Sequence, residues 1–174
     1  MRNQETVCSV CLLPVRGRSS SIATKVLRRR ITPGEFALYG AHELLFVYGT
    51  LLSGDRGPTG RTQRARLAGE ARFIATGTTE GRLYDLGRYP GIVVPSPGEI
   101  VHGEVLELAI AARTLRWLDV YEGIVPGRDA HNEYERLLCD VMLDDGQGRR
   151  AWIYVYRGLL AAATHIPESR WLRT

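Results

Sequence analysis

Glu122 is the residue of this sequence best placed for acid/base chemistry. It follows Ala111, Leu115 and Leu118 at spacings that place all four residues on one face of a helix. A carboxyl on an apolar face loses hydration, and the last turn of a helix is the negative end of its dipole. Both effects raise the pKa toward the range where a general acid or base works. We therefore predict that Glu122 is catalytic; a solvated residue at a frayed helix end is the alternative.

Asp119 is the rival carboxylate on the same helix. It falls off the stripe of Leu115 and Leu118, on the side occupied by Arg113 and Arg116. This pattern predicts a surface position, which makes Asp119 a control for Glu122.

A second set of candidate residues lies where a buried strand ends. The apolar run 44–48 stops abruptly at Gly49, which is typical of a buried strand followed by a tight turn. Glycine in such a turn lets successive backbone N–H groups point into a hollow, where they bind a carboxylate or an oxyanion. An ordinary strand-to-loop turn is the alternative. The predicted substrate-binding residues are Tyr48, Gly49, Thr50 and Leu51.

The cysteines and histidines form no recognisable metal or nucleophile motif. Cys8 and Cys11 form a CxxC pair, but no second pair or nearby histidine completes a zinc site. Cys139 shares its strand face with apolar residues, which indicates a buried, inert thiol. The four histidines show no metal-ligand spacing, and no Gly-x-Ser-x-Gly motif is present. We expect no bound metal.

The net charge of +4 comes from the N-terminal part of the chain. Residues 1–43 hold seven of the 23 basic residues and three of the 19 acidic ones, so sixteen of each remain in residues 44–174. This balance argues against nucleic-acid binding by the folded part. We interpret residues 1–43 as a flexible basic extension. The apolar run 7–15 is too short to span a membrane, and we expect a cytoplasmic protein.

Residues 44–174 are predicted to form one domain of short strands with few helices. The one convincing helix covers 109–122 and ends at Gly123, while the glycine-rich stretch 54–60 is predicted to be a mobile loop. The pattern indicates an α+β fold with a small, curled, barrel-like mixed sheet. The predicted strands after the first one are 71–76, 81–86, 100–108, 134–143 and 151–156, the last two joined by a hairpin at Asp144-Asp145-Gly146.

The order of the motifs resembles the gamma-glutamylcyclotransferase-like family, in its gamma-glutamylamine cyclotransferase and avirulence-induced branch. The resemblance covers about residues 44–174 and leaves 1–43 unexplained. Each motif alone is modest, but their succession is specific. The motifs are Tyr48-Gly49-Thr50-Leu51, Gly81–Gly87, Tyr89–Val93, Gly103-Glu104-Val105, Leu118–Gly123, Tyr134-Glu135-Arg136 and Ile166–Trp171.

The resemblance implies an enzyme in which the amine of a gamma-glutamyl group attacks its own gamma-carbonyl, releasing an amine and 5-oxoproline. It implies that Glu122 is the proton acceptor, that the turn at Tyr48 holds the gamma-glutamyl group, and that no cofactor is needed. A small-molecule gamma-glutamyl substrate would be the partner, without nucleic acid or membrane, and the oligomeric state stays open.

Two departures from the family pattern concern the substrate. The turn reads Tyr-Gly-Thr-Leu instead of the Tyr-Gly-Ser-Leu associated with glutathione-specific members, so glutathione is the weaker candidate. The stretch 124–133 is longer than a simple turn and is expected to shape the leaving-group side. A non-catalytic module that binds a small ligand on the same fold is the alternative function.

Overall fold

A computed structural model describes residues 43–128 and 131–171 of the chain. The predicted extension therefore lies outside the described residues, apart from Glu43, where the first strand begins. No helix in the described ranges is long and apolar enough to cross a membrane. The elements are β1 (Glu43–Val47), α1 (Arg61–Glu70), β2 (Ala71–Glu80), β3 (Arg82–Asp85), β4 (Pro90–Val93), β5 (Ile100–Leu108), α2 (Ala111–Tyr121), β6 (Tyr134–Leu143), β7 (Gly148–Tyr156) and β8 (Thr164–His165).

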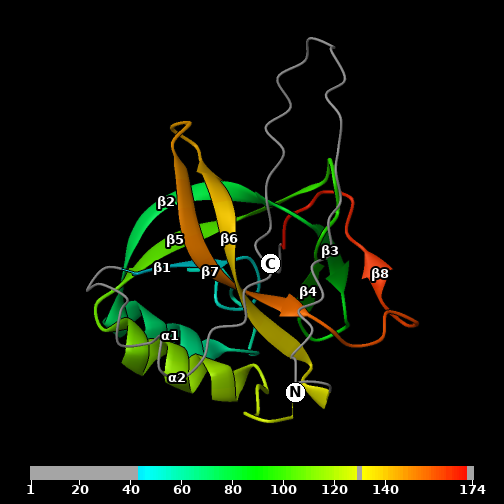
Figure 1. The fold of residues 1–174 in the computed structure, drawn as a ribbon, viewed down its shortest axis with the longest axis horizontal. Helices are drawn as coiled ribbons and strands as arrows, with labels where there is room; N and C mark the ends of the chain where they lie inside the picture. The colour runs from blue at the N-terminus through cyan, green and yellow to red at the C-terminus, as the bar shows by residue number, and fades with distance from the viewer. Residues whose placement is uncertain (1–42, 129–130, 172–174) are drawn as a thin grey trace, which may run out of the picture.

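Five strands close into a barrel in the order β1-β5-β2-β6-β7. All neighbouring pairs are antiparallel except the pair that closes the barrel, in which β1 runs parallel to β7 with Leu45 opposite Trp152. The two helices lie together on one side of the barrel, as Figure 1 shows. The α+β class and the curled mixed sheet predicted from the sequence are confirmed.

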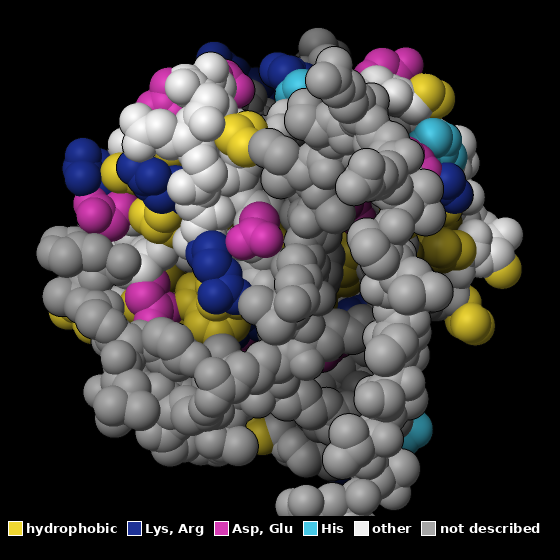
Figure 2. All heavy atoms as spheres, turned by 45° about the horizontal axis from the view of Figure 1, so that its top comes forward, with side chains coloured by type: hydrophobic (Ala, Val, Ile, Leu, Met, Phe, Trp, Pro, Cys, Tyr) yellow, Lys and Arg dark blue, Asp and Glu magenta, His cyan; other side chains and the backbone are white. Residues whose placement is uncertain are grey.

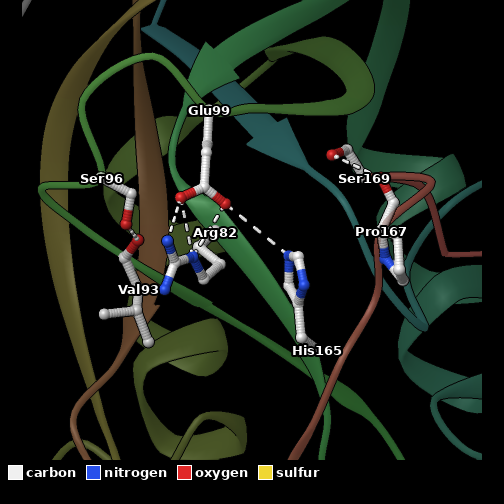
Figure 3. Close-up of polar contacts among 7 residues, drawn as sticks. All are labelled: Arg82, Val93, Ser96, Glu99, His165, Pro167 and Ser169. Carbon is white, nitrogen blue, oxygen red and sulfur yellow. Dashed lines mark hydrogen bonds and ion pairs between the residues drawn. The ribbon is translucent and has the colours of Figure 1, made fainter.

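A small second sheet, ordered β4-β3-β8, lies beside the barrel in Figure 1. At position 91 of β4 a side chain would lie 2.8 Å from the Cβ of Tyr156, so Gly91 permits the close approach of β4 to β7. Figure 3 shows how Glu99 bridges β3 and β8, the other two strands of this small sheet. Arg82 of β3 donates from Nε to the Glu99 carboxylate at 2.8 Å, and His165 of β8 lies 3.7 Å from it. These groups are exposed, so the pairs stabilise the sheet only weakly.

Alternate residues of β1 pack into two different hydrophobic clusters. Phe46 joins one cluster with the interior residues of β5, β6 and β7. Its neighbours Leu45 and Val47 point the other way and pack with Leu115 and Leu118 of α2. One short strand thus ties the barrel to the helix layer, and the site lies directly after its end.

Helix α2 follows the prediction, whereas α1 was not predicted. Leu115 and Leu118 are fully buried, and Glu122 is the C-terminal cap residue of α2. Helix α1 buries only Leu67, so it has no apolar stripe that a periodicity search could find. It begins after Gly60, which adopts the left-handed conformation at φ 72°.

Charged side chains of both signs are interspersed on the molecular face drawn in Figure 2. Among the coloured side chains of that face, basic groups alternate with acidic ones and do not gather into one patch.

Candidate active site

A cavity of about 370 Å³ opens where β1 ends against the C-terminal end of α2. It brings together Glu122 and all four predicted residues of the turn. A volume of this size is that of a small-molecule site. The cavity is lined by Phe46, Val47, Tyr48, Gly49, Thr50, Leu51, Thr59, Arg88, Tyr89, Pro90, Tyr121, Glu122, Gly123, Glu133, Tyr134 and Tyr154.

The turn after β1 is held firmly by its neighbours. The Leu52 N–H donates to the Gly49 carbonyl at 2.9 Å and closes the turn. A Cβ at Gly49 would lie 2.6 Å from Cγ of Pro90, so only glycine allows this approach. Among the described residues no protein acceptor meets the N–H groups of Gly49, Thr50 and Leu51. These N–H groups can therefore donate to an anionic ligand.

Tyr48 forms a wall of the cavity, and its hydroxyl is already engaged. It donates to the Tyr154 carbonyl at 2.7 Å and accepts from the Ile92 N–H at 3.3 Å. Burial raises the pKa of Tyr48, so the hydroxyl stays protonated. Tyr48 can therefore contact a ligand with its ring, while its hydroxyl fixes β7 and β4 around the site.

Glu122 lies where α2 ends. Its N–H donates to the Leu118 carbonyl at 2.8 Å, and Gly123 ends the helix at φ 73°. The residue is partly exposed, and it lines the cavity. Burial, with smaller contributions from the charges of Glu133 and Asp119, raises the pKa of Glu122 from 4.5 to about 8. Among the described residues no donor contacts its carboxyl, so no hydrogen bond from these residues offsets the lost hydration.

Further tyrosines enclose the same cavity. The Tyr134 hydroxyl donates to the Pro90 carbonyl at 3.0 Å, and its ring meets Tyr156 edge-on at 5.5 Å between centroids. Burial raises the pKa of both Tyr134 and Tyr154. The tyrosine hydroxyls are thus neutral hydrogen-bonding groups, and an ionised carboxylate is the base that the cavity can supply.

Asp119 does not have the surface position predicted for it. Its carboxylate accepts from the Tyr154 hydroxyl at 2.8 Å, lies 3.2 Å from the Arg136 guanidinium, and is 24% exposed. Burial raises its pKa. The prediction failed because helical spacing places Asp119 beside Arg113 and Arg116 but cannot reveal that β6 and β7 cover that flank. Asp119 supports the cavity wall through Tyr154, so it is no control for Glu122.

Three polar residues of the cavity, Arg88, Tyr89 and Glu133, were not individually predicted from the sequence as functional residues. The Tyr89 hydroxyl donates to Oε1 of Glu133 at 2.7 Å, which raises the pKa of Tyr89 to about 12. Arg88, next to Tyr89, supplies a cation at the rim. Tyr89 belongs to a motif recognised in the sequence, and Glu133 directly precedes another, but neither motif assigns a role to them.

Cys139 is buried in β6, as its strand pattern predicted. Its thiol donates to the Ala151 carbonyl at 3.4 Å, and burial raises its pKa to about 12. Cys8 and Cys11 lie outside the described residues. Within residues 43–128 and 131–171, no three of the His, Cys, Asp and Glu side chains are grouped so that they could hold a metal ion.

Comparison with known proteins shows the family to which the chain belongs. The family described as "Gamma-glutamyl cyclotransferase, AIG2-like" matches residues 45–173. A Vibrio cholerae protein named "Putative gamma-glutamylcyclotransferase" is 36% identical over 114 residues, which are 66% of this chain and 82% of the relative. The chain therefore belongs to the gamma-glutamylcyclotransferase family, and it is a gamma-glutamylcyclotransferase-like protein.

Solved structures share the fold. An AIG2-like protein from Mus musculus aligns with a TM-score of 0.53 and 24% identity, over 74% of this chain and 82% of the mouse protein. YkqA from Bacillus subtilis aligns with a TM-score of 0.54 and 24% identity, over 75% of this chain but only 39% of YkqA. At this identity the likeness concerns the fold alone.

Proposed function

We propose that the protein converts a gamma-glutamyl amine or peptide into 5-oxoproline and a free amine, with Glu122 as general acid/base. The observation that carries the proposal is the shared cavity, in which the buried Glu122 carboxyl and the turn Gly49–Leu51 form walls of one small-molecule site. One folded gamma-glutamyl group can contact both walls.

The reaction begins with a proton transfer to Glu122. With a pKa of about 8, roughly a tenth of this carboxyl is ionised at pH 7. The ionised form takes a proton from the alpha-ammonium group of the substrate. A carboxyl whose pKa lies near neutral pH can both take this proton and give it up again. The freed amine then attacks the gamma-carbonyl carbon, and the new C–N bond closes a five-membered ring.

The second step breaks the original amide bond. In the tetrahedral intermediate, Glu122 gives its proton to the leaving nitrogen and takes the second proton of the attacking nitrogen. The electrons of the oxyanion then restore the carbonyl, the C–N bond to the leaving amine breaks, and Glu122 passes this second proton to the released amine. Atoms and charge balance without any cofactor. Holding amine and carbonyl in attack geometry supplies much of the acceleration, since the reaction is intramolecular.

The turn N–H groups bind the anionic part of the gamma-glutamyl group in this scheme. Thr50 and Leu51 line the cavity, and their N–H groups meet no acceptor among the described residues. Glu133 and Arg88 lie at the same cavity and face the remainder of the substrate. In this scheme the leaving amine lies toward Tyr89 and Glu133.

A panel assay tests this function. The purified protein is incubated with gamma-glutamyl amines, gamma-glutamyl dipeptides and glutathione, and 5-oxoproline release is measured. We expect turnover of amines or dipeptides and weaker turnover of glutathione. A protein that binds panel members in calorimetry but releases no 5-oxoproline from any of them would instead be a binding module on this fold.

A further inference from the structure

Arg64 of α1 lies behind the substrate turn and contacts it from outside the cavity. Its guanidinium donates from Nη1 to the Thr50 carbonyl and from Nη2 to the Gly57 carbonyl at 3.2 Å. Its side chain is 14% exposed, and Nη1 lies 4.0 Å from Oδ2 of the buried Asp55. Arg64 is absent from the residues that line the cavity, whereas Thr50 and Leu51 are among them.

We infer that Arg64 is a positioning residue that aims the Leu51 N–H into the cavity. A trans peptide is planar, so its N–H points opposite to its C=O. When Arg64 holds the Thr50 carbonyl outward, the Leu51 N–H faces the other way, toward the site. The Leu52 N–H acts in the same way on the peptide between Gly49 and Thr50. It donates to the Gly49 carbonyl at 2.9 Å, so the Thr50 N–H points in the opposite direction. This assignment rests on the proposed function.

The charge of Arg64 also strengthens the N–H as a donor. A cation on the carbonyl oxygen polarises the peptide, and hydrogen bonds in a chain reinforce one another where water is excluded. Asp55 keeps the guanidinium in place, because it accepts from the Gly57 N–H at 2.6 Å and faces Arg64. The donor is thus oriented before substrate arrives, which is how such sites stabilise negative charge.

Helix α1 is brought close to the turn by its N-terminal cap. A Cβ at Gly60 would lie 3.1 Å from the Thr50 carbonyl oxygen and 3.1 Å from the Tyr121 hydroxyl. Gly60 therefore allows the start of α1 to approach the turn, and Arg64 follows one helical turn later. A helix that buries only Leu67 contributes little core. Its contact with the turn gives it a role in the site.

The test compares Arg64→Ala and Arg64→Gln with Arg61→Ala, an exposed arginine of the same helix. We expect kcat/KM for 5-oxoproline release to fall roughly 10- to 100-fold in Arg64→Ala, below the 10²- to 10³-fold typical of deleting a donor outright. Methylguanidinium at millimolar concentration should restore part of the rate in Arg64→Ala only. Arg61→Ala should keep the wild-type rate.

A second readout does not depend on activity. The amide resonance of Leu51 in a ¹H–¹⁵N spectrum should shift in Arg64→Ala and Arg64→Gln and stay in place in Arg61→Ala. An unchanged Leu51 resonance, or a kcat/KM within twofold of wild type in a folded Arg64 variant, would overturn the assignment. If Arg64→Ala does not fold, Arg64→Gln decides by the same two criteria. A wild-type protein that turns over no gamma-glutamyl compound would instead contradict the proposed function.

Discussion

A glutamate lies at the C-terminal end of each of the two described helices, and the surroundings of these two glutamates shift their pKa values in opposite directions. Glu70, the last residue of α1, accepts from the Thr114 hydroxyl at 2.7 Å and from the Trp117 indole N–H at 3.0 Å. Those hydrogen bonds, Thr114 first, lower the pKa of Glu70 to about 2. Glu122, the cap residue of α2, is buried without a donor among the described residues, and its pKa rises to about 8.

The difference shows that residue type and helix position do not decide what a carboxylate does. Glu70 is ionised at neutral pH and joins α1 to α2, so it contributes to stability. Glu122 is held mostly neutral beside a cavity, which costs stability but makes proton exchange possible near neutral pH. The protein thus has one hydrogen-bonded, ionised carboxylate and one carboxylate with a raised pKa beside a cavity, within the same helix layer.

The largest effect is expected from Glu122→Gln, which keeps the size of the side chain but removes its ability to take a proton. General acid/base groups contribute 10²- to 10⁴-fold, and the proposed mechanism uses Glu122 in every proton transfer, so we expect kcat to fall near the upper end. Substrate binding should persist in calorimetry. Glu168→Gln, an exposed carboxylate outside the cavity, is the control and should keep full activity.

The same substitution should stabilise the fold at neutral pH. Because the folded pKa of about 8 lies above 4.5, the stability from protonated Glu122 is fully present below pH 4.5 and is lost progressively as the pH rises from 4.5 through 8. Glutamine is not subject to this loss. At 1.36 kcal/mol per unit over the interval from 4.5 to pH 7, the gain of Glu122→Gln at pH 7 is about 3 kcal/mol. Urea unfolding at pH 4 and pH 7 measures it; an equal gain at both would contradict the mechanism.

Glu70→Gln should instead destabilise the fold at neutral pH. Its folded pKa of about 2 lies below 4.5, so its stability is present above 4.5 and is lost as the pH falls through 2. Hydrogen bonds to a charged acceptor are worth about 1.5–3 kcal/mol, and the side chain is 13% exposed. We expect a loss of about 1–2 kcal/mol at pH 7, measured by urea unfolding, with kcat unchanged. A variant as stable as wild type would show that the hydrogen bonds of Glu70 to α2 do not stabilise the fold.

The smallest effect is expected from Glu133→Gln. The charge of Glu133 is the second cause of the raised pKa of Glu122, after burial. Removing it should lower that pKa while burial keeps it above 4.5. A ¹³C titration of the Glu122 carboxyl measures the midpoint in both proteins. An upward shift, or none, would show that Glu133 does not act on Glu122.

The sequence predicted the parts of the site that follow a local pattern. Helical spacing placed Glu122 with Leu115 and Leu118, and the abrupt end of an apolar run at Gly49 located the turn. Strands β5 and β6 have the predicted bounds, whereas β2 continues to Glu80, beyond the predicted end at Thr76. Glu122 and the turn, which line one cavity, could be picked out because each is marked by residues close by in the chain.

What the sequence could not predict depends on contacts between distant segments. Tyr154 reaches Asp119 across 35 positions, so the helix alone gave no sign that Asp119 is covered. Helix α1 has no apolar period, and only its contacts with the turn and α2 show why it forms there. The low pKa of Glu70, which distinguishes it from Glu122, likewise depends on hydrogen-bond donors of α2 that lie 44 and 47 positions away in the chain.

The pH dependence of kcat/KM tests the central claim most directly, namely that a buried Glu122 with a raised pKa is the acid/base of 5-oxoproline formation. The base must be ionised in the free enzyme, so kcat/KM should rise tenfold per pH unit on its acidic limb and level off near the pKa of about 8. Glu122→Gln should lack this limb. An acidic limb with its midpoint near 4.5, or one that persists in Glu122→Gln, would contradict the account.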